Sequence, residues 1–208
     1  LPIRTKICKK YSFISMISAK SKKAALILFC ILLPLFLLLF SYQVALFFSE
    51  VTPMQKQVFG FLQNEGELQE GFTPAEISHL GDVKQVMKYA EYVFYALLLI
   101  VTITLTYCRR DKELVLKLLG YGGKTTLLVM LLIFLISFFF FNELFTLFHL
   151  LFFPQGNWLF PADSMLIQIF PTDFFITISR NIFLLTLSWG ILFILSVYYL
   201  RYVRGQRH

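Results

Sequence analysis

Four long stretches without any charged residue constrain the fold of this chain more than any other feature. Residues 24–48, 92–108, 125–142 and 181–200 contain no Lys, Arg, Asp or Glu. A helix that crosses the hydrocarbon core of a bilayer needs roughly 17–25 apolar residues. The 208-residue chain is also 58% hydrophobic, well above the usual share in soluble domains. We therefore expect an all-α integral membrane protein, a single domain over residues 1–208.

The expected transmembrane helices lie at about residues 24–48, 89–108, 125–142 and 181–200. The first is expected to stay in the membrane, because its apolar run is too long for a cleaved signal peptide and no small-x-small site follows it. Five spans remain an alternative, because few charges mark residues 143–180. Cys8, Cys30 and Cys108 are too scattered for a disulfide framework or a zinc ribbon, so we interpret them as structural.

The basic residues lie at alternate ends of the four stretches. Fifteen of the nineteen Lys and Arg residues lie before residue 24, between residues 109 and 124, or after residue 200. Ten of the twelve acidic residues lie in or beside the other two loops. This positive-inside pattern predicts cytoplasmic termini and two extracytoplasmic loops, 49–88 and 143–180. The net charge of +7 is thus interpreted as a topology signal and an attraction to anionic headgroups, not as a nucleic-acid interface.

The first outer loop contains a helix start. Thr73 is a good N-cap, Pro74 suits the first helical position, and Glu76 completes a capping box. Gly81 is expected to interrupt this helix, and Asp82 to cap a second helix that enters the second span. His79 is therefore expected at a corner between two helices, with Glu76 and Asp82 each three residues away, so that either acid could share its helical face.

The second outer loop contains the segment FHLLFFPQGNWLFPADSMLIQIFP, residues 148–171, which three prolines break. If residues 125–153 formed one helix it would be about 43 Å long, more than a hydrocarbon core of roughly 30 Å. It must tilt, break near Asn142, or project outward, and each option places His149 at or beyond the outer interface. Asp163 or Ser164 is expected to cap a short helix over residues 165–170. The aromatic side chains favour an interfacial, partly re-entrant flap.

Two histidines are the candidate catalytic residues. His79 and His149 come from different outer loops, and an imidazole with a pKa of about 6.5 can accept and donate a proton near neutral pH. Alternatively, each ring simply hydrogen-bonds a backbone carbonyl. A zinc site built from His79, Asp82, His149 and Asp163 is conceivable, but the sequence lacks any tight ligand spacing. His208 is interpreted as a solvated tail residue.

Other chemistries lack support. No Gly-x-Ser-x-Gly nucleophile elbow is present. Gly122-Gly123-Lys124-Thr125 matches only the end of a phosphate-binding loop, and no strand precedes it. No ionisable residue lies in the middle of a span, as a proton-driven transporter would require.

Several groups of residues in the chain resemble a known family. They are His79-Leu80-x-Asp82-Val83-Lys84, Leu118-Leu119-Gly120-Tyr121-Gly122-Gly123, Phe148-His149, Phe153-x-x-Gly156-Asn157-Trp158-x-Phe160, and Leu166-Ile167-x-x-Phe170-Pro171-x-x-Phe174-Phe175. Together they resemble the lipoprotein intramolecular transacylase (Lit) family, found mostly in Gram-positive bacteria. The similarity extends from Ala24 onward and includes the four-span plan.

The resemblance implies that His79 and His149 are the catalytic pair. It implies that the sn-2 acyl chain of a diacylglyceryl lipoprotein moves to the α-amine of its N-terminal cysteine, giving the N-acyl, S-monoacylglyceryl (lyso) form. Partners would be that lipoprotein and membrane lipid, in the bacterial plasma membrane, with the site outside and no cofactor or metal. The sequence does not decide which histidine is the base, and His149 is favoured. Substrate-binding or orienting roles are expected for Asp82, Asn157, Trp158, Asp163 and Glu76.

Two other classes stay open at the level of sequence. One is a non-catalytic membrane adaptor or transporter subunit whose outer loops bind a partner. The other is a metal-dependent lipid hydrolase. The oligomeric state and the acyl-chain preference do not follow from the sequence.

Overall fold

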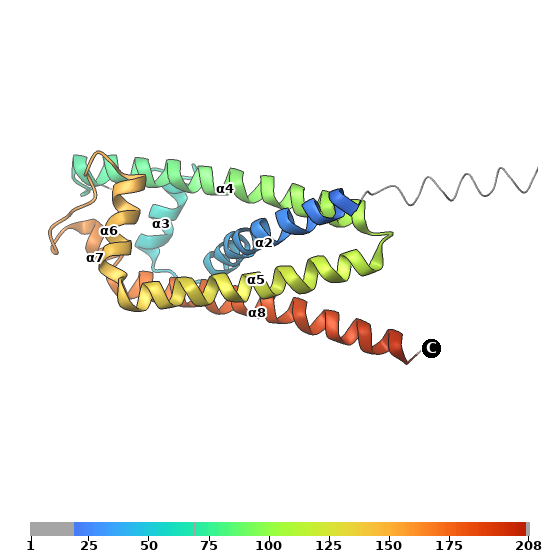
Figure 1. The fold of residues 1–208 in the computed structure, drawn as a ribbon. Helices are drawn as coiled ribbons and strands as arrows, with labels where there is room; N and C mark the ends of the chain where they lie inside the picture. Colours follow the sequence, from blue (N-terminus) through green and yellow to red (C-terminus); the bar gives the residue numbers. More distant parts are fainter. Residues whose placement is uncertain (1–18, 69, 207–208) are drawn as a thin grey trace, which may run out of the picture.

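The computed structural model describes residues 19–68 and 70–206, and over this part the chain is helical with no strand. Four long helices form the body of the molecule (Figure 1): α2 (Ala19–Phe47), α4 (Pro74–Cys108), α5 (Lys112–Phe139) and α8 (Thr172–Gly205). Each is long and apolar enough to cross a membrane. The prediction of an all-α protein with four spans is confirmed.

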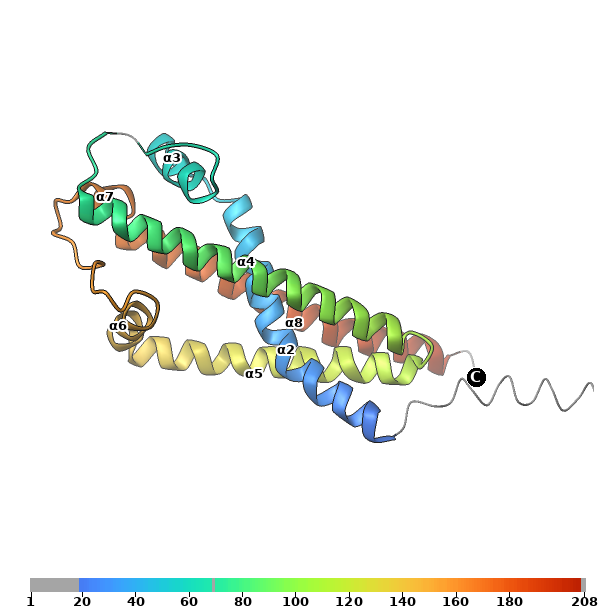
Figure 2. The same ribbon diagram turned by 90° about the horizontal axis from the view of Figure 1, so that it is seen from above.

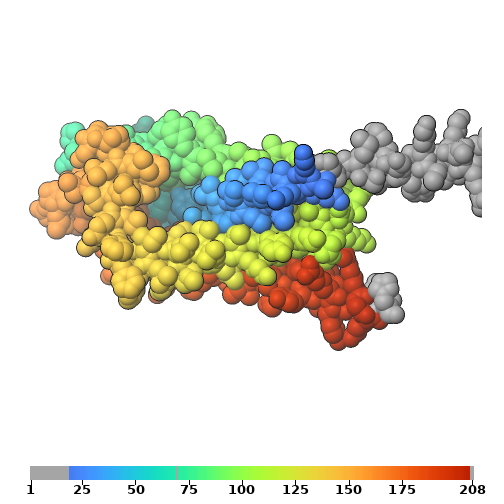
Figure 3. Space-filling model, in the orientation of Figure 1, coloured from blue at the N-terminus to red at the C-terminus, as the bar shows by residue number. Residues whose placement is uncertain are grey.

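Three shorter helices gather at one end of the bundle, which we call the loop end: α3 (Pro53–Leu62), α6 (Phe141–Phe152) and α7 (Met165–Ile169) (Figure 1). The opposite end, which we call the basic end, contains the start of α2, the turn between α4 and α5 and the end of α8 (Figures 1 and 3). The interpretations of Cys8, of His208 and of the basic residues before residue 19 and at position 207 fall outside the described residues.

The outer surface of the long helices is apolar, as lipid requires. Ile31 in α2, Leu99 in α4 and Leu195 in α8 each expose more than half of their surface. In water such side chains would be expected in a core, whereas acyl chains solvate them without cost. The bundle therefore buries little of its hydrophobic surface and relies on a few close helix contacts.

Those contacts are made mainly by α2, α5 and α8. Figure 2 shows α2 crossing the other helices obliquely, and it packs on both α5 and α8, which also pack on each other. A Cβ atom added to Gly123 of α5 would lie 2.8 Å from the carbonyl oxygen of Gly190 in α8. The two backbones meet there because neither helix carries a side chain, a common device in membranes. This explains the Gly122-Gly123 pair as a packing feature of a helix.

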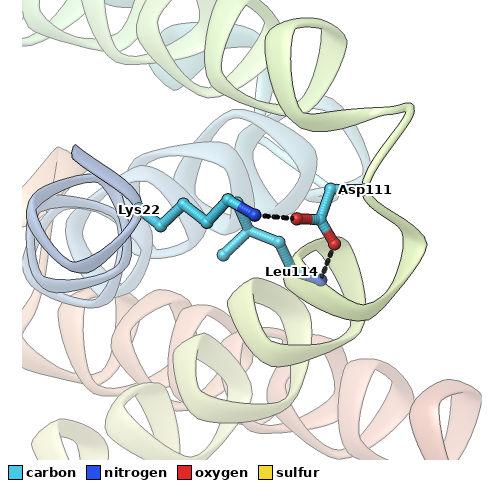
Figure 4. A network of polar contacts seen from close by, with 3 residues as sticks. All are labelled: Lys22, Asp111 and Leu114. Atoms are coloured by element: carbon cyan, nitrogen blue, oxygen red, sulfur yellow. Dashed lines mark hydrogen bonds and ion pairs between the residues drawn. The ribbon is translucent and has the colours of Figure 1, made fainter. Parts of the chain in front are cut away.

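The basic end is tied together by an ion pair. Lys22 of α2 donates to the Oδ2 atom of Asp111 at 2.7 Å, and Oδ1 of Asp111 accepts the N–H of Leu114, so Asp111 is also the N-cap of α5 (Figure 4). These hydrogen bonds, from Lys22 first and then from Leu114, lower the pKa of the Asp111 carboxyl. The turn between α4 and α5 is thereby held against α2.

Two helix boundaries differ from the sequence predictions. The break expected at Gly81 is wrong: α4 runs without interruption from Pro74 to Cys108, so His79 lies inside a long helix and not at a corner. A single glycine costs only about 1 kcal/mol in a helix, less than 35 residues of continuous hydrogen bonding recover. The long third segment does break, at Phe140, two residues before the position expected.

The close contact of α5 and α8 generates a stability prediction. Gly123→Ala places a methyl group against a backbone oxygen that cannot rotate away, and we expect it to lower the free energy of unfolding by about 1–3 kcal/mol. The matched control is Gly81→Ala, since a Cβ atom at Gly81 meets nothing within 4 Å and alanine favours the helix. Thermal unfolding of both variants in detergent measures the difference, and equal melting temperatures would contradict the proposed contact.

Candidate active site

The loop end is organised around α7, which is held at both ends by side chains from two other helices. Glu76 of α4 accepts a hydrogen bond from the backbone N–H of Leu166 at 2.8 Å. Gln55 of α3 donates from Nε2 to the carbonyl oxygen of Ile169, also at 2.8 Å. Both side chains at the same time close capping boxes on their own helices, with Thr73 and Thr52 respectively. Each therefore fixes two helices relative to one another.

Glu76 is almost fully buried, yet it is held in its ionised form. Burial by itself would raise the pKa of this carboxyl, but the N–H groups of Leu166 and Thr73 and the hydroxyl of Thr73 donate to it, and the net effect is a pKa below the ordinary value. The Glu76 oxygens are occupied by these partners. Glu76 thus positions the backbone of the site.

His79 lies three residues after Glu76, ahead of the apolar part of α4. It is only 8% exposed and contacts two phenylalanine rings, with its centroid 4.7 Å from that of Phe153 and 5.5 Å from that of Phe160. Burial lowers the pKa of His79, the nearby His149 lowers it further, and Asp82 opposes them. The ring is therefore neutral near pH 7, and its buried Nδ1 has no hydrogen-bond partner.

His149 lies in the last turn of α6. Its Nδ1 is 2.7 Å from the carbonyl oxygen of Phe145, one turn earlier. A carbonyl can only accept, so Nδ1 carries the proton and the lone pair of the neutral ring is on Nε2. The indole of Trp158 packs against the imidazole with centroids 4.6 Å apart, and Phe145 packs on it at 4.1 Å.

Phe153 is the side chain that the two histidines share. Its ring centroid lies 4.7 Å from His79 and 5.6 Å from His149, and the residue is almost fully buried. Among the described residues no hydrogen bond joins the two imidazoles. The two rings thus border the same phenylalanine and influence each other electrostatically, but they do not touch as a bonded pair.

Asp82 ties the loop after α6 to α4. Its Oδ2 accepts hydrogen bonds from Nδ2 of Asn157, at 2.7 Å, and from Nε2 of Gln155. Nδ2 of Asn157 also donates to Oγ of Ser78 at 3.1 Å. These bonds hold the loop so that Trp158, the next residue, lies on His149. Both N–H groups of Asn157 are used, so its amide nitrogen has no donor left for a ligand.

Asp163 is separate from this network. It lies at the rim of an open hollow of about 680 Å³, beside Ala75, Leu159 and Pro161, and its backbone carbonyl accepts a hydrogen bond from Gln168. Over residues 19–68 and 70–206, no three His, Cys, Asp or Glu side chains come close enough to hold a metal ion. His79, Asp82, His149 and Asp163 therefore do not form the four-residue zinc site considered as an alternative.

Comparison with known proteins places the chain in a family. The family model for the lipoprotein intramolecular transacylase Lit matches residues 55–175. This segment contains both histidines, α7 and the Asp82 network. The chain belongs to the Lit family.

The fold leads to the same group of proteins. An in meso structure of the membrane integral lipoprotein intramolecular transacylase Lit from Bacillus cereus superimposes with a TM-score of 0.74 at 19% identity, over 91% of this chain and 99% of that chain. A variant of the Bacillus cereus protein with a histidine-to-arginine mutation gives 0.73 at 17% identity, over 96% and 99%. A search of curated protein sequences found no match. As a Lit-family member, the chain is a multi-pass membrane acyltransferase that acts on lipoproteins.

Several residues of this Lit-family site were missed by sequence reasoning. The helix α3 and its Gln55 were not predicted, although Thr52-Pro53-Met54-Gln55 has the same capping signature as Thr73-Pro74-Ala75-Glu76. Ser78 and Gln155 gave no signal, because their roles depend on Asn157 and Asp82, more than seventy residues away in the chain. Ser164 was one of two predicted caps for α7, and the structure selects it.

The double role of Glu76 generates a prediction. Glu76→Ala removes the cap of α4 and leaves the buried N–H of Leu166 without a partner, so we expect a loss of about 2–4 kcal/mol in stability. The amide of Leu166 should exchange faster with deuterium, which mass spectrometry of α7 peptides measures. Glu67→Ala, at an exposed acid of the same loop, is the control. Unchanged exchange at Leu166 would contradict the assigned bond.

The lowered pKa of His79 predicts a pH dependence of stability. In the unfolded chain this histidine takes up a proton near pH 6.5, whereas in the folded chain it does so only at lower pH. Its contribution is therefore present above pH 6.5 and is lost as the pH falls below that value. Between pH 7.5 and 5 the melting temperature of the native chain should therefore fall more steeply on acidification than that of His79→Leu, which has no group to protonate at this position. Parallel curves would show that the ring is not held neutral.

Proposed function

We propose that this chain transfers the sn-2 acyl chain of a diacylglyceryl lipoprotein to the α-amine of the same N-terminal cysteine, using His149 and His79 without an acyl-enzyme. A C–N bond forms and the ester C–O bond breaks, so an amide and a free glycerol hydroxyl replace an ester and an amine. No oxidant, nucleotide or second substrate is needed to balance this reaction. Donor and acceptor share one molecule, and orientation of such groups is worth about 7–11 kcal/mol.

Three buried polar atoms without partners support this proposal. Over the described residues, five buried side-chain N or O atoms lack a hydrogen bond, and three of them belong to this site: Nδ1 of His79, Oδ1 of Asn157 and Nε1 of Trp158. Buried polar atoms are almost always paired in folded proteins. A cluster of unpaired ones therefore favours a ligand that supplies the missing partners.

The chemistry of each unpaired atom fits one part of the substrate. The α-amine is a donor, and Oδ1 of Asn157 can accept one of its hydrogens. The ester carbonyl becomes an oxyanion during attack, and the indole N–H of Trp158 can donate to it. The side chain of Asn157 is not available as this donor, because both of its N–H groups are already bonded to Ser78 and Asp82.

The two histidines have different tasks in the proposed reaction. His149 accepts the amine proton through Nε2, because its Nδ1 already donates to Phe145. His79, neutral and buried, donates a hydrogen bond to the glycerol oxygen as the C–O bond breaks, and the proton that His149 took up from the amine passes to that oxygen, so both imidazoles end the cycle neutral. Phe153 and Phe160 keep water from the ester carbon, which favours attack by the amine over hydrolysis.

The charge pattern indicates how the protein is oriented in the membrane. The basic end faces the cytoplasm and the loop end faces outward, in the plasma membrane of the cell. Asp82, Asn157 and Glu76 orient the catalytic groups, and Asp163 at the rim of the open hollow is assigned to the peptide that follows the lipidated cysteine.

Single substitutions of His149 and Trp158 test the proposal. His149→Gln retains a polar side chain but has no base, and we expect conversion of a synthetic diacylglyceryl lipopeptide to fall by at least about 10²-fold. Trp158→Phe, which removes the proposed oxyanion donor, should lower kcat by about 10²–10³-fold. The readout is fragment-ion mass spectrometry, which locates the acyl chain on oxygen or on nitrogen.

The matched control is Trp189→Phe. Trp189 also has a buried indole N–H without a partner, but it lies in α8 against Phe40, away from the histidines. This variant should transfer the acyl chain at the native rate. Full activity of both His149→Gln and His79→Ala would overturn the two-histidine mechanism, and release of free fatty acid would indicate hydrolysis instead.

A further inference from the structure

The basic end of the bundle contains a second cavity, far from the histidines. It has a volume of about 220 Å³ and lies where the end of α4, the start of α5 and the end of α8 meet. Its apolar wall is formed by leucine and valine side chains: Leu105, Val115, Leu116, Leu119 and Leu200. Three cations lie around it, namely Arg109, Lys112 and Arg204. A cavity with both kinds of lining fits a molecule that is anionic at one end and apolar at the other.

The charges around this cavity are not neutralised by the protein. The two acids at this end, Asp111 and Glu113, are paired with Lys22 at 2.7 Å and with Arg201 at 3.2 Å, and neither of these cations lines the cavity. Figure 4 shows Lys22 and Asp111 pointing at each other, with the second oxygen of Asp111 on Leu114. Within the described part of the chain, Arg109, Lys112 and Arg204 have no acidic partner.

The cavity also lies between two helices, α4 and α8, that have few contacts with each other. α4 packs chiefly on α2, whereas it has almost no close contact with α8. Arg109 follows the last residue of α4, and Arg204 lies in the last turn of α8. A ligand that contacts both would connect two helices that the protein itself leaves apart.

From these observations we infer that the cavity binds the phosphate headgroup of an anionic phospholipid, such as phosphatidylglycerol, from the leaflet at the basic end. The phosphate lies among Arg109, Lys112 and Arg204, and the first part of an acyl chain lies along Leu105 and Leu200. A volume of about 220 Å³ has room for one glycerophosphate group. Basic pockets between transmembrane helices bind such headgroups in general.

The inference does not depend on the acyl-transfer proposal, since the cavity and the histidines lie at opposite ends. The bound lipid is structural, holding α4 against α8, and undergoes no reaction. The expected consequence is stabilisation of the folded bundle that increases with the mole fraction of anionic lipid.

Lipid-dependent stability of the full chain tests the inference. Melting temperatures are measured in mixed micelles with phosphatidylglycerol, with phosphatidylcholine, and with phosphatidylcholine plus inorganic phosphate. We expect phosphatidylglycerol alone to raise the melting temperature, and native mass spectrometry to show one retained anionic lipid. Equal melting temperatures in both lipids would overturn the inference, and an equal effect of inorganic phosphate would show a free-phosphate site in place of a lipid site.

A charge-matched pair of variants separates this cavity from general attraction to anionic lipid. Arg109→Gln with Arg204→Gln removes two cations from the lining, and we expect retention of phosphatidylglycerol to fall by about fivefold or more for each charge removed. Arg110→Gln with Lys117→Gln removes the same charge from exposed positions outside the lining, and should leave retention nearly unchanged. Equal losses in the two double variants would show that binding is nonspecific.

Discussion

The arrangement of the loop end depends on two hydrogen bonds that hold α7, one from Gln55 and one to Glu76. A five-residue helix has too little surface and too few internal hydrogen bonds to keep its position by itself. Glu76 takes the free N–H at one end and Gln55 supplies a donor to a free carbonyl at the other. Val58, Leu62 and Leu80 of α3 and α4 then pack on Leu166 and Ile169, so the same small helix also seals an apolar cluster.

The loop end and the long helices of the bundle are held together by different kinds of contact. The long helices expose most of their side chains to lipid, and their association rests on a few sites such as Gly123 against Gly190. At the loop end, side-chain hydrogen bonds add to the apolar cluster around α7 in holding the loops in place. Asp82 collects the amides of Gln155 and Asn157, and in doing so sets Trp158 on His149. The site is thus held by charge-assisted hydrogen bonds, which are both stronger and more directional than apolar contacts.

The two histidines differ in their surroundings, and this difference suits the proposed pairing of a base with a neutral hydrogen-bond donor. His79 is buried between phenylalanines and is held neutral, whereas His149 is locked into one tautomer by a carbonyl of its own helix. Neither ring needs a carboxylate partner to be oriented. At the opposite end of the molecule Asp111 and Glu113 pair with Lys22 and Arg201, and three further cations line a cavity between helices.

The sequence by itself determined the helical class, the four spans and the capping box at Thr73, because each is carried by residues close together in the chain. It was wrong about Gly81, since the hydrogen bonds of a long helix outweigh the preference of one glycine, and it missed α3 although Thr52-Pro53-Met54-Gln55 carried the signal. Only the tertiary structure decided that Glu76 holds α7, that Asp82 binds the loop of Asn157, and that Phe153 lies between both imidazoles. Those contacts join residues that are four to ninety positions apart, and the pairing of distant polar groups follows from helix packing, which no local pattern encodes.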